Sequence, residues 1–524
     1  MSKKHNKFNN PNCDNKMSFD ECELAIMRQI VDEIEAVKPD VNINSPEITK
    51  IIGILERFLI RKQLICYGGT AINNILPKDA QFYDKQTEIP DYDFYSFEPM
   101  DDAIELADIY NRAGYEDVEA KAGVHHGTYK VFVNFIGIAD ITYLPQQLFA
   151  EIKKDAKTVA GILYAPANFL RMNMFLELSR PKGDVSRWEK VLKRLTLLNK
   201  HYPLKTETDC MSKAFQRQLT TNYKDSERLY TLVRDTFADL EVVFFGGYAS
   251  ALYSHYMPDH QRHLVKKIPD FDVLCEDPDK AAFVICSTLT NNGFLDVIAI
   301  ENEPIGEIIP RHIEIRVGKE TLAFIYLPSS CHSYNTISVD KRDIRVATIE
   351  TMLTFYLAFY YVNDPNKYDR DRIICMAKFL FDVEQKNRME QKGVLKRFTM
   401  DCYGKQDTLD DIRNTKTAKY KELKNKRGTL EYDEWFLKYE PAKGNRPKYF
   451  KPIKYTLTLS KTRKSNTGAN PSKTKPPSLS KTQNQSISIS PKVKGRRKNN
   501  EPVKPKKKRK TQKKRVRKES SYLF

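Results

Sequence analysis

Residues 66–77 read CYGGTAINNILP, and residues 244–258 read FFGGYASALYSHYMP. Each stretch places a Gly-Gly pair after a short apolar run and before a segment of helical character. One Gly-Gly pair is typical of a turn and decides little by itself. Two pairs in similar company raise the question of whether the chain carries two copies of one functional unit.

Two more tags recur in the same order as the Gly-Gly pairs. They are Ile-Pro-Asp-aromatic-Asp at 89–93 and 268–272, and Tyr-Leu-Pro at 143–145 and 326–328. The first and second copies of the three tags are 178, 179 and 183 residues apart, so the loops between the tags barely change in length. We therefore predict a tandem duplication.

Each copy predicts a strand, the Gly-Gly pair, a helix, an Asp-x-Asp strand, a hairpin and a closing helix. The hairpin strands and closing helices are expected at 129–134, 138–144 and 168–180, and again at 312–317, 322–327 and 348–361. This mixture of short apolar strands and helices predicts an α+β fold with two tandem domains, each built on a small mixed sheet.

The charge of the 524-residue chain is concentrated at one end. Residues 461–524 hold 22 Lys and Arg against two acids, whereas the first 460 residues hold 65 basic and 66 acidic residues. The predicted organisation is a disordered N-terminus at 1–17, N-terminal helices at 18–62, a first domain at 63–205, a second domain at 206–400, a charged and aromatic extension at 401–455, and a disordered basic tail at 456–524.

The cysteines and the apolar runs restrict the class of protein. Nine cysteines, an odd number with no Cys-x-x-Cys pair, predict reduced thiols and neither a disulfide framework nor a zinc site. No secretory signal is recognised, and no apolar run approaches the ~18 residues of a membrane helix. We expect a soluble protein that does not enter membranes.

Three carboxylates of the first copy are candidates for metal binding. Asp91 and Asp93 lie two apart on a predicted strand, so they share one face with backbones about 6–7 Å apart. Asp140 is a lone charge in the apolar strand at 138–144, and a buried acid needs a partner. Three converging carboxylates fit a two-metal site with Mg²⁺ or Mn²⁺ for nucleotidyl transfer.

The Gly-Gly-Thr segment is a candidate for phosphate binding. Gly68 and Gly69 at the start of a helix let backbone N–H groups approach an anion, and the helix dipole adds to the attraction. Thr70 is expected either to bind a phosphate or to cap the helix. Either motif alone is more often structural, whereas the ordered set together with Asp140 favours catalysis.

The second copy keeps its glycines and the Asp pair at 270 and 272 but departs elsewhere. Aligning the Tyr-Leu-Pro tags places Ala323 opposite Asp140, with Glu314 as a weak substitute. Tyr248 replaces Thr70 and is expected to put a ring where phosphates would lie. We predict an active first copy and an inactive second copy.

These motifs resemble a known superfamily. Gly-Gly-Thr, Asp-x-Asp and a distal Asp resemble the signature of DNA polymerase β-like nucleotidyltransferases. The longer stretches GGTAINNILP, DYDFY and IADITYLP resemble the poly(A) polymerase catalytic subunits of large cytoplasmic DNA viruses, of the poxvirus and giant-virus type. The resemblance covers roughly residues 20–400.

The resemblance implies template-independent addition of AMP from ATP to mRNA 3′ ends. It implies catalytic Asp91, Asp93 and Asp140 holding two Mg²⁺ or Mn²⁺ ions, and Gly68, Gly69 and Thr70 holding the ATP triphosphate. An RNA 3′ hydroxyl is the implied nucleophile, and homodimerisation is one option in the giant-virus branch. Adenine selectivity is not assigned to residues, because Arg171, Asn173, Lys190 and Lys193 fit an ordinary helix face at least as well.

Other interpretations stay open. The chain could be another RNA 3′-terminal nucleotidyltransferase, or a catalytically inactive RNA-binding scaffold. The intact set of three carboxylates argues against the scaffold, because a scaffold does not need them. The basic tail is suited to holding RNA by electrostatic attraction and to releasing it at high salt. Its run KPKKKRK at 504–510 resembles a nuclear localisation signal, whereas the family resemblance favours the host cytoplasm, in a viral factory or virion.

Overall fold

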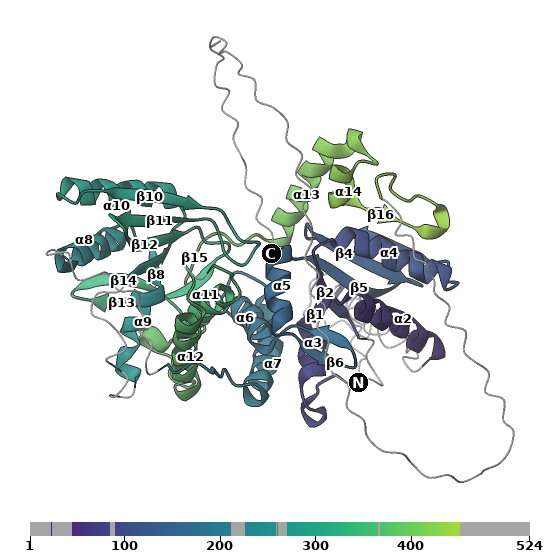
Figure 1. The fold of residues 1–524 in the computed structure, drawn as a ribbon, viewed down its shortest axis with the longest axis horizontal. Helices are drawn as coiled ribbons and strands as arrows, with labels where there is room; N and C mark the ends of the chain where they lie inside the picture. The colour runs from purple at the N-terminus through teal and green to yellow at the C-terminus, as the bar shows by residue number, and fades with distance from the viewer. Residues whose placement is uncertain are drawn as a thin grey trace, which may run out of the picture. The chain divides into compact units, whose positions relative to one another are not determined.

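The strands in the described part of the chain assemble into two sheets of eight strands each, labelled in Figure 1. The computed structural model describes residues 22–23, 45–83, 90–210, 226–257, 259, 262, 270–364 and 367–450. The α+β class predicted from the sequence is confirmed.

The first sheet has the strand order β16-β3-β4-β5-β2-β1-β7-β6. We call the elements from α2 to α7 the first lobe. Its elements are α2 (Pro46–Lys62), β1 (Ile65–Tyr67), α3 (Gly68–Ile75), η1 (Lys78–Ala80), β2 (Tyr92–Ser96), α4 (Pro99–Arg112), β3 (Val118–Ala122), β4 (Thr128–Val133), β5 (Ile136–Tyr143), α5 (Gln146–Lys154), β6 (Lys157–Val159), β7 (Ile162–Tyr164), α6 (Ala167–Leu178), η2 (Val185–Arg187) and α7 (Trp188–His201).

The second sheet has the strand order β10-β11-β12-β9-β8-β14-β13-β15. We call the elements from α8 to η5 the second lobe. Its elements are α8 (Ser226–Asp239), β8 (Val243–Phe245), α9 (Gly246–Leu252), η3 (Ser254–Tyr256), β9 (Phe271–Leu274), α10 (Pro278–Asn291), β10 (Val297–Asn302), β11 (His312–Val317), β12 (Glu320–Tyr326), β13 (His332–Val339), β14 (Arg342–Ala347), α11 (Ile349–Tyr360), α12 (Arg370–Lys386) and η5 (Gly393–Leu395).

Seven strands of each sheet follow one topology. The run β3-β4-β5-β2-β1-β7-β6 corresponds strand by strand to β10-β11-β12-β9-β8-β14-β13. In both runs the strand before Gly-Gly is antiparallel to the Asp-x-Asp strand and parallel to the strand on its other side. The predicted duplication is thereby confirmed at the level of the fold.

The segment after the second lobe returns to both sheets. Its elements are β15 (Cys402–Tyr403), α13 (Leu409–Leu423), η6 (Lys424–Lys426), α14 (Leu430–Phe436), β16 (Lys438–Tyr439) and η7 (Pro441–Lys443). β15 pairs with β13 of the second sheet, whereas β16 pairs with β3 of the first. The Tyr129 hydroxyl donates to the Glu434 carbonyl at 3.0 Å. This charged and aromatic segment therefore packs on the folded core.

Local sequence explains where the early helix begins. Ser45 caps α2 by accepting a hydrogen bond from the Ile48 N–H at 3.1 Å, and Pro46 occupies the first turn. Both positions were predicted from the sequence. Of the preceding predicted helix, only Cys22 and Glu23 are described, and both are helical. The segments predicted to be disordered at 1–17 and 456–524 lie outside the described residues.

The two lobes pack through their corresponding closing helices, α6 and α11. Phe169 of α6 meets Tyr361 edge to face at 5.4 Å between ring centroids. The Ser333 N–H donates to the Ser179 carbonyl at 2.8 Å, which adds a backbone tie between the lobes. The described residues of both lobes and of the segment up to residue 450 belong to one compact unit.

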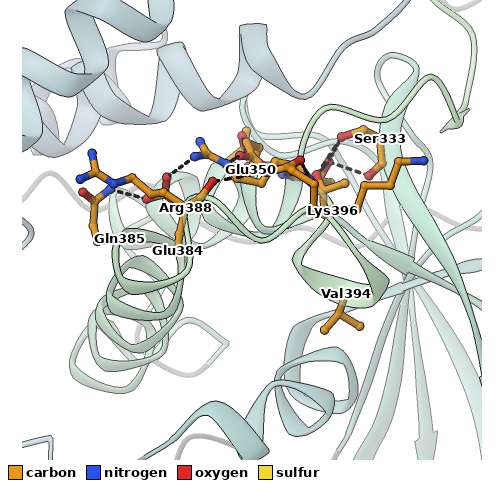
Figure 2. Close-up of polar contacts among 12 residues, drawn as sticks. Ser333, Glu350, Glu384, Gln385, Arg388, Val394 and Lys396 are labelled. Carbon is orange, nitrogen blue, oxygen red and sulfur yellow. Dashed lines mark hydrogen bonds and ion pairs between the residues drawn. The ribbon is translucent and has the colours of Figure 1, made fainter.

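A buried ionic network holds the second lobe together. Arg397 forms ion pairs with Glu350 of α11 and with Glu384 of α12, the latter at 2.7 Å, and all three side chains are at most 6% exposed. Figure 2 shows Glu350 and Glu384 in this network beside Arg388. Two buried carboxylates need a cation, so Arg397 fastens two helices to the segment that follows them.

The prediction of reduced thiols is wrong for five of the described cysteines, because Cys22, Cys210, Cys331, Cys375 and Cys402 are all disulfide-bonded. Cys210 is disulfide-bonded to Cys375 and Cys331 to Cys402, with Cα atoms 5.4 and 5.1 Å apart. The partners are 165 and 71 residues apart in sequence, so tertiary proximity creates the pairs and short-range spacing does not reveal them. Among the described helices, none is long and apolar enough to cross a membrane.

Candidate active site

A glycine at the start of α3 brings a helix end against a carboxylate. Gly68 follows β1 directly and has φ +72°, a conformation that side-chain-bearing residues rarely adopt. A Cβ on Gly68 would overlap the Asp93 carboxylate of the neighbouring strand β2. The residue is therefore glycine for two reasons, its backbone conformation and the closeness of Asp93.

The sheet places the predicted carboxylates side by side. Parallel pairing of β2 with β5 sets Asp93 directly opposite Asp140, and Asp91 stands just before β2. All three line a cleft of about 1690 Å³ whose wall also includes Gly68 and Gly69. The structure thus brings together residues that the sequence separates by up to 72 positions.

The carboxylates influence one another electrostatically. Burial, together with the neighbouring charges of Asp91 and Asp140, raises the pKa of Asp93 to about 7. Desolvation and the charge of Asp140 also raise the pKa of Asp91. Lys130 of β4 forms an ion pair with Asp140 and, together with Arg187, partly offsets the negative charge of this cluster.

The cluster has the chemistry of a divalent-cation site. A cluster of three carboxylates supplies the hard oxygen ligands that Mg²⁺ and Mn²⁺ prefer. Within the described ranges, no three Asp, Glu, His or Cys side chains already converge as a ready metal cage. Lys130 occupies Asp140 instead, so a cation bound here would compete with the lysine for that carboxylate.

Thr70 has a structural partner. Its hydroxyl donates to the backbone carbonyl of Asp91 at 2.6 Å, and the side chain is only 3% exposed. It does not cap α3, whose N-cap position is Tyr67 without a side-chain cap. The hydroxyl therefore holds α3 to the segment that carries Asp91.

Aromatic residues that the sequence reasoning missed line the same cleft. Tyr67 stacks on Tyr95 with 3.9 Å between ring centroids, and Phe169 of α6 meets Tyr95 edge to face. The Tyr67 hydroxyl shares a hydrogen bond of 2.9 Å with Thr142 of β5. The position of Tyr67 next to Gly68 was the available signal. It carried no weight alone, because an aromatic residue in a buried strand is usually core.

The residues considered for nucleotide contact fall into two groups, those away from the cleft and those that line it. Arg171 is buried and donates to the Asn199 side chain at 2.8 Å, so it serves α6–α7 packing. Lys193 pairs with Glu189 on the exposed face of α7. Asn173 and Lys190 do line the cleft, as does Arg194, which the sequence reasoning did not single out.

The second lobe fills the corresponding face with rings. Strand pairing sets Phe324 opposite Asp272, whereas Ala323 pairs with Phe271. The alignment that placed Ala323 at the position of Asp140 is therefore wrong by one residue, because Tyr-Leu-Pro begins one position closer to this site in the second lobe. Glu314, opposite Phe324, is engaged by Arg316 at 2.6 Å and does not replace the missing carboxylate.

Tyr248 departs from its predicted place as well. The ring is 4% exposed and packs in the core against Phe244, at 4.9 Å, and Phe271, at 5.5 Å. It therefore does not project over a phosphate site. The prediction was wrong because this position of the helix faces the core in both lobes, as the burial of Thr70 also shows.

Comparisons with known proteins agree with the motifs. Residues 53–184, which include all six predicted site residues, match the family model described as the poly(A) polymerase catalytic subunit. A putative poly(A) polymerase catalytic subunit of Acanthamoeba polyphaga mimivirus is 36% identical over 159 residues, covering 29% of this chain and 26% of the relative. The predicted family resemblance is confirmed over this region.

Two further matches extend the comparison. A putative poly(A) polymerase catalytic subunit of African swine fever virus (isolate Warthog/Namibia/Wart80/1980) is 31% identical over 186 residues, covering 32% of this chain and 39% of the relative. The matched region thus spans about a quarter to two fifths of these curated relatives. The crystal structure of the Megavirus polyadenylate synthase matches with TM-score 0.65 and 19% identity, over 83% of this chain and 89% of that one, and so shares the fold.

Proposed function

We propose that this chain is a poly(A) polymerase that transfers AMP from ATP to the 3′ hydroxyl of RNA without a template. The observation that carries the proposal is the grouping of Asp91, Asp93 and Asp140 around the helix start at Gly68 in one large cleft. The family model and the viral relatives, which are described as poly(A) polymerase catalytic subunits, support it.

In this proposal the first lobe supplies the chemistry. Asp91, Asp93 and Asp140 would hold two Mg²⁺ or Mn²⁺ ions, which supply charge stabilisation at the reacting phosphate when bound. Gly68 and Gly69, with the backbone of Thr70, would face the triphosphate at the positive end of α3. The RNA 3′ oxygen would attack the α-phosphorus, and the bond to the β-phosphate oxygen would break to release pyrophosphate.

The remaining features concern partners and place. Mg²⁺ or Mn²⁺, ATP and mRNA 3′ ends are the proposed ligands, and the basic tail is proposed to hold RNA by charge. A homodimer stays a proposal that size measurement in solution would test. The named relatives are viral proteins, which favours the host cytoplasm over the nucleus as the site of action.

The test is extension of a labelled RNA primer with each nucleoside triphosphate separately, in Mg²⁺ or Mn²⁺. Long products with ATP alone, absent in Asp91→Ala/Asp93→Ala, are expected. Extension with another nucleotide would instead indicate a different RNA 3′-terminal nucleotidyltransferase. RNA binding without extension under any condition would leave the scaffold interpretation.

A further inference from the structure

Helix α7 presents one basic side chain to the cleft and its neighbour to solvent. Val191, Leu195 and Leu198 are buried and fix the rotation of the helix. Arg194 consequently faces the cleft, whereas Lys193 points outward and pairs with Glu189 at 2.6 Å. Two adjacent basic residues thus have different environments, which offers a matched comparison.

A tyrosine anchored to α3 holds the Arg194 side chain. Asn73 of α3 is buried, and its side-chain oxygen accepts the N–H groups of Phe82 and Tyr83 at 2.8 and 2.9 Å. The Tyr83 hydroxyl in turn accepts a hydrogen bond of 2.7 Å from the Arg194 guanidinium. The Arg194 guanidinium also lies over the Phe82 ring, 4.9 Å from its centroid.

These contacts place the guanidinium at the start of α3. A Cβ added to Gly69 would lie 2.9 Å from a terminal nitrogen of Arg194 and would overlap the Tyr83 hydroxyl. Among the described residues, no carboxylate lies within ion-pair distance of Arg194, although acids line the same cleft. A positive charge is therefore held beside Gly69, and within the described ranges no carboxylate is in direct contact with it.

We propose that Arg194, oriented by Tyr83, binds the terminal phosphates of the incoming nucleoside triphosphate. The inference rests on the proposed function and names a residue of its substrate site. A guanidinium donates two parallel hydrogen bonds to phosphate oxygens, and the α3 N-terminus faces the same anion. The carboxylates of the cleft are negatively charged, and a fixed cation beside Gly69 would attract the β- and γ-phosphates.

The experiment compares equilibrium binding of ATP, AMP and inorganic triphosphate to wild type, Arg194→Ala, Arg194→Lys and Lys193→Ala. Arg194→Ala should weaken the binding of ATP and of inorganic triphosphate by roughly tenfold or more, which is the effect of losing one hydrogen bond to a charged group. AMP lacks the terminal phosphates, so the affinity of the variant for AMP should equal that of the wild type. Arg194→Lys should be intermediate and Lys193→Ala unchanged.

Kinetics separate binding from a merely structural role. In primer extension, Arg194→Ala should raise KM for ATP more than it lowers kcat, and KM for RNA should not change. Tyr83→Phe removes only the hydroxyl that orients Arg194, so it should produce a smaller effect of the same kind. Thermal unfolding of each variant identifies loss of fold.

Each outcome decides the inference. Equal weakening of ATP and AMP binding by Arg194→Ala, or unchanged ATP affinity in Arg194→Ala, overturns it while leaving polymerase activity of the wild type intact. A wild type that binds none of the three ligands overturns both this inference and the proposed function. Recovery of triphosphate affinity in Arg194→Lys supports a phosphate contact.

Discussion

The two lobes share a topology but differ on one face of their sheets. In the first lobe, Lys130 lies opposite Asp140, and Asp93 is next along the sheet. In the second lobe, Glu314 lies opposite Phe324, beside Asp272. The Asp140 carboxylate of the first lobe thus gives way to the Phe324 ring in the second, and Lys130 gives way to Glu314.

The neighbouring row shows the same exchange. Thr128 and Thr142 share a hydrogen bond of 3.3 Å in the first lobe, whereas His312 stacks on Tyr326 at 4.6 Å in the second. What both lobes keep is the glycine with positive φ against an aspartate. The comparison shows that the strand–glycine–helix junction belongs to the fold, while the surrounding face decides whether the lobe has an open polar cleft.

The largest expected difference between the lobes is catalytic. Asp93→Asn should reduce primer extension by roughly 10³-fold or more, about 4 kcal/mol of barrier at 1.36 kcal/mol per tenfold. Asp272→Asn should leave the rate unchanged because Phe324 occupies the place of a further ligand. Single-turnover extension rates test both. Loss of activity in Asp272→Asn alone would assign the chemistry to the second lobe.

The second lobe should matter more for stability. Arg397→Met leaves Glu350 and Glu384 buried without their cation, so the free energy of unfolding should fall by roughly 3–5 kcal/mol. Arg342→Met removes an exposed ion pair with Asp239 and should cost at most about 1 kcal/mol. Urea unfolding measures both changes. Similar losses for the two variants would contradict a structural role for the buried network.

The shared junction offers a smaller and sharper comparison. Gly68→Ala and Gly246→Ala each place a Cβ at positive φ against an aspartate, and each should destabilise by roughly 1–3 kcal/mol. Only Gly68→Ala should also impair extension, since it displaces Asp93. Activity measured well below the unfolding temperature separates the effects. Equal activity losses would mean that both junctions serve catalysis.

The smallest expected effect concerns pH in the metal-free protein. The pKa of Asp93 is about 7 when folded, against an ordinary value of 3.8, so the folded state binds more protons between these values. The stabilisation from the protonated carboxyl is present below about pH 4 and is lost as pH rises through 7. Asp93→Asn should remove this component. Thermal unfolding in the presence of a chelator, measured across this pH range, would show a different dependence of the unfolding temperature on pH for the wild type and for the variant.

Particular residues show how far sequence reaches. The recurrence of Gly-Gly, Asp-x-Asp and Tyr-Leu-Pro determined the duplication, because local patterns and chain order persist in any fold of this chain. Ser45 and Pro46 fixed the start of α2 for the same reason. Asp140 stood out as a lone acid in an apolar strand, and its strand pairs with that of Asp93.

Tertiary structure alone decided what depends on register and on distant contacts. Choosing Ala323 instead of Phe324 is an error of one residue, yet in a strand it turns the side chain to the opposite face of the sheet. The Cys331–Cys402 bond joins segments far apart in the sequence, as does the contact of Arg194 with Tyr83. Sequence singled out the candidate site residues, and tertiary packing determined which side chains surround them.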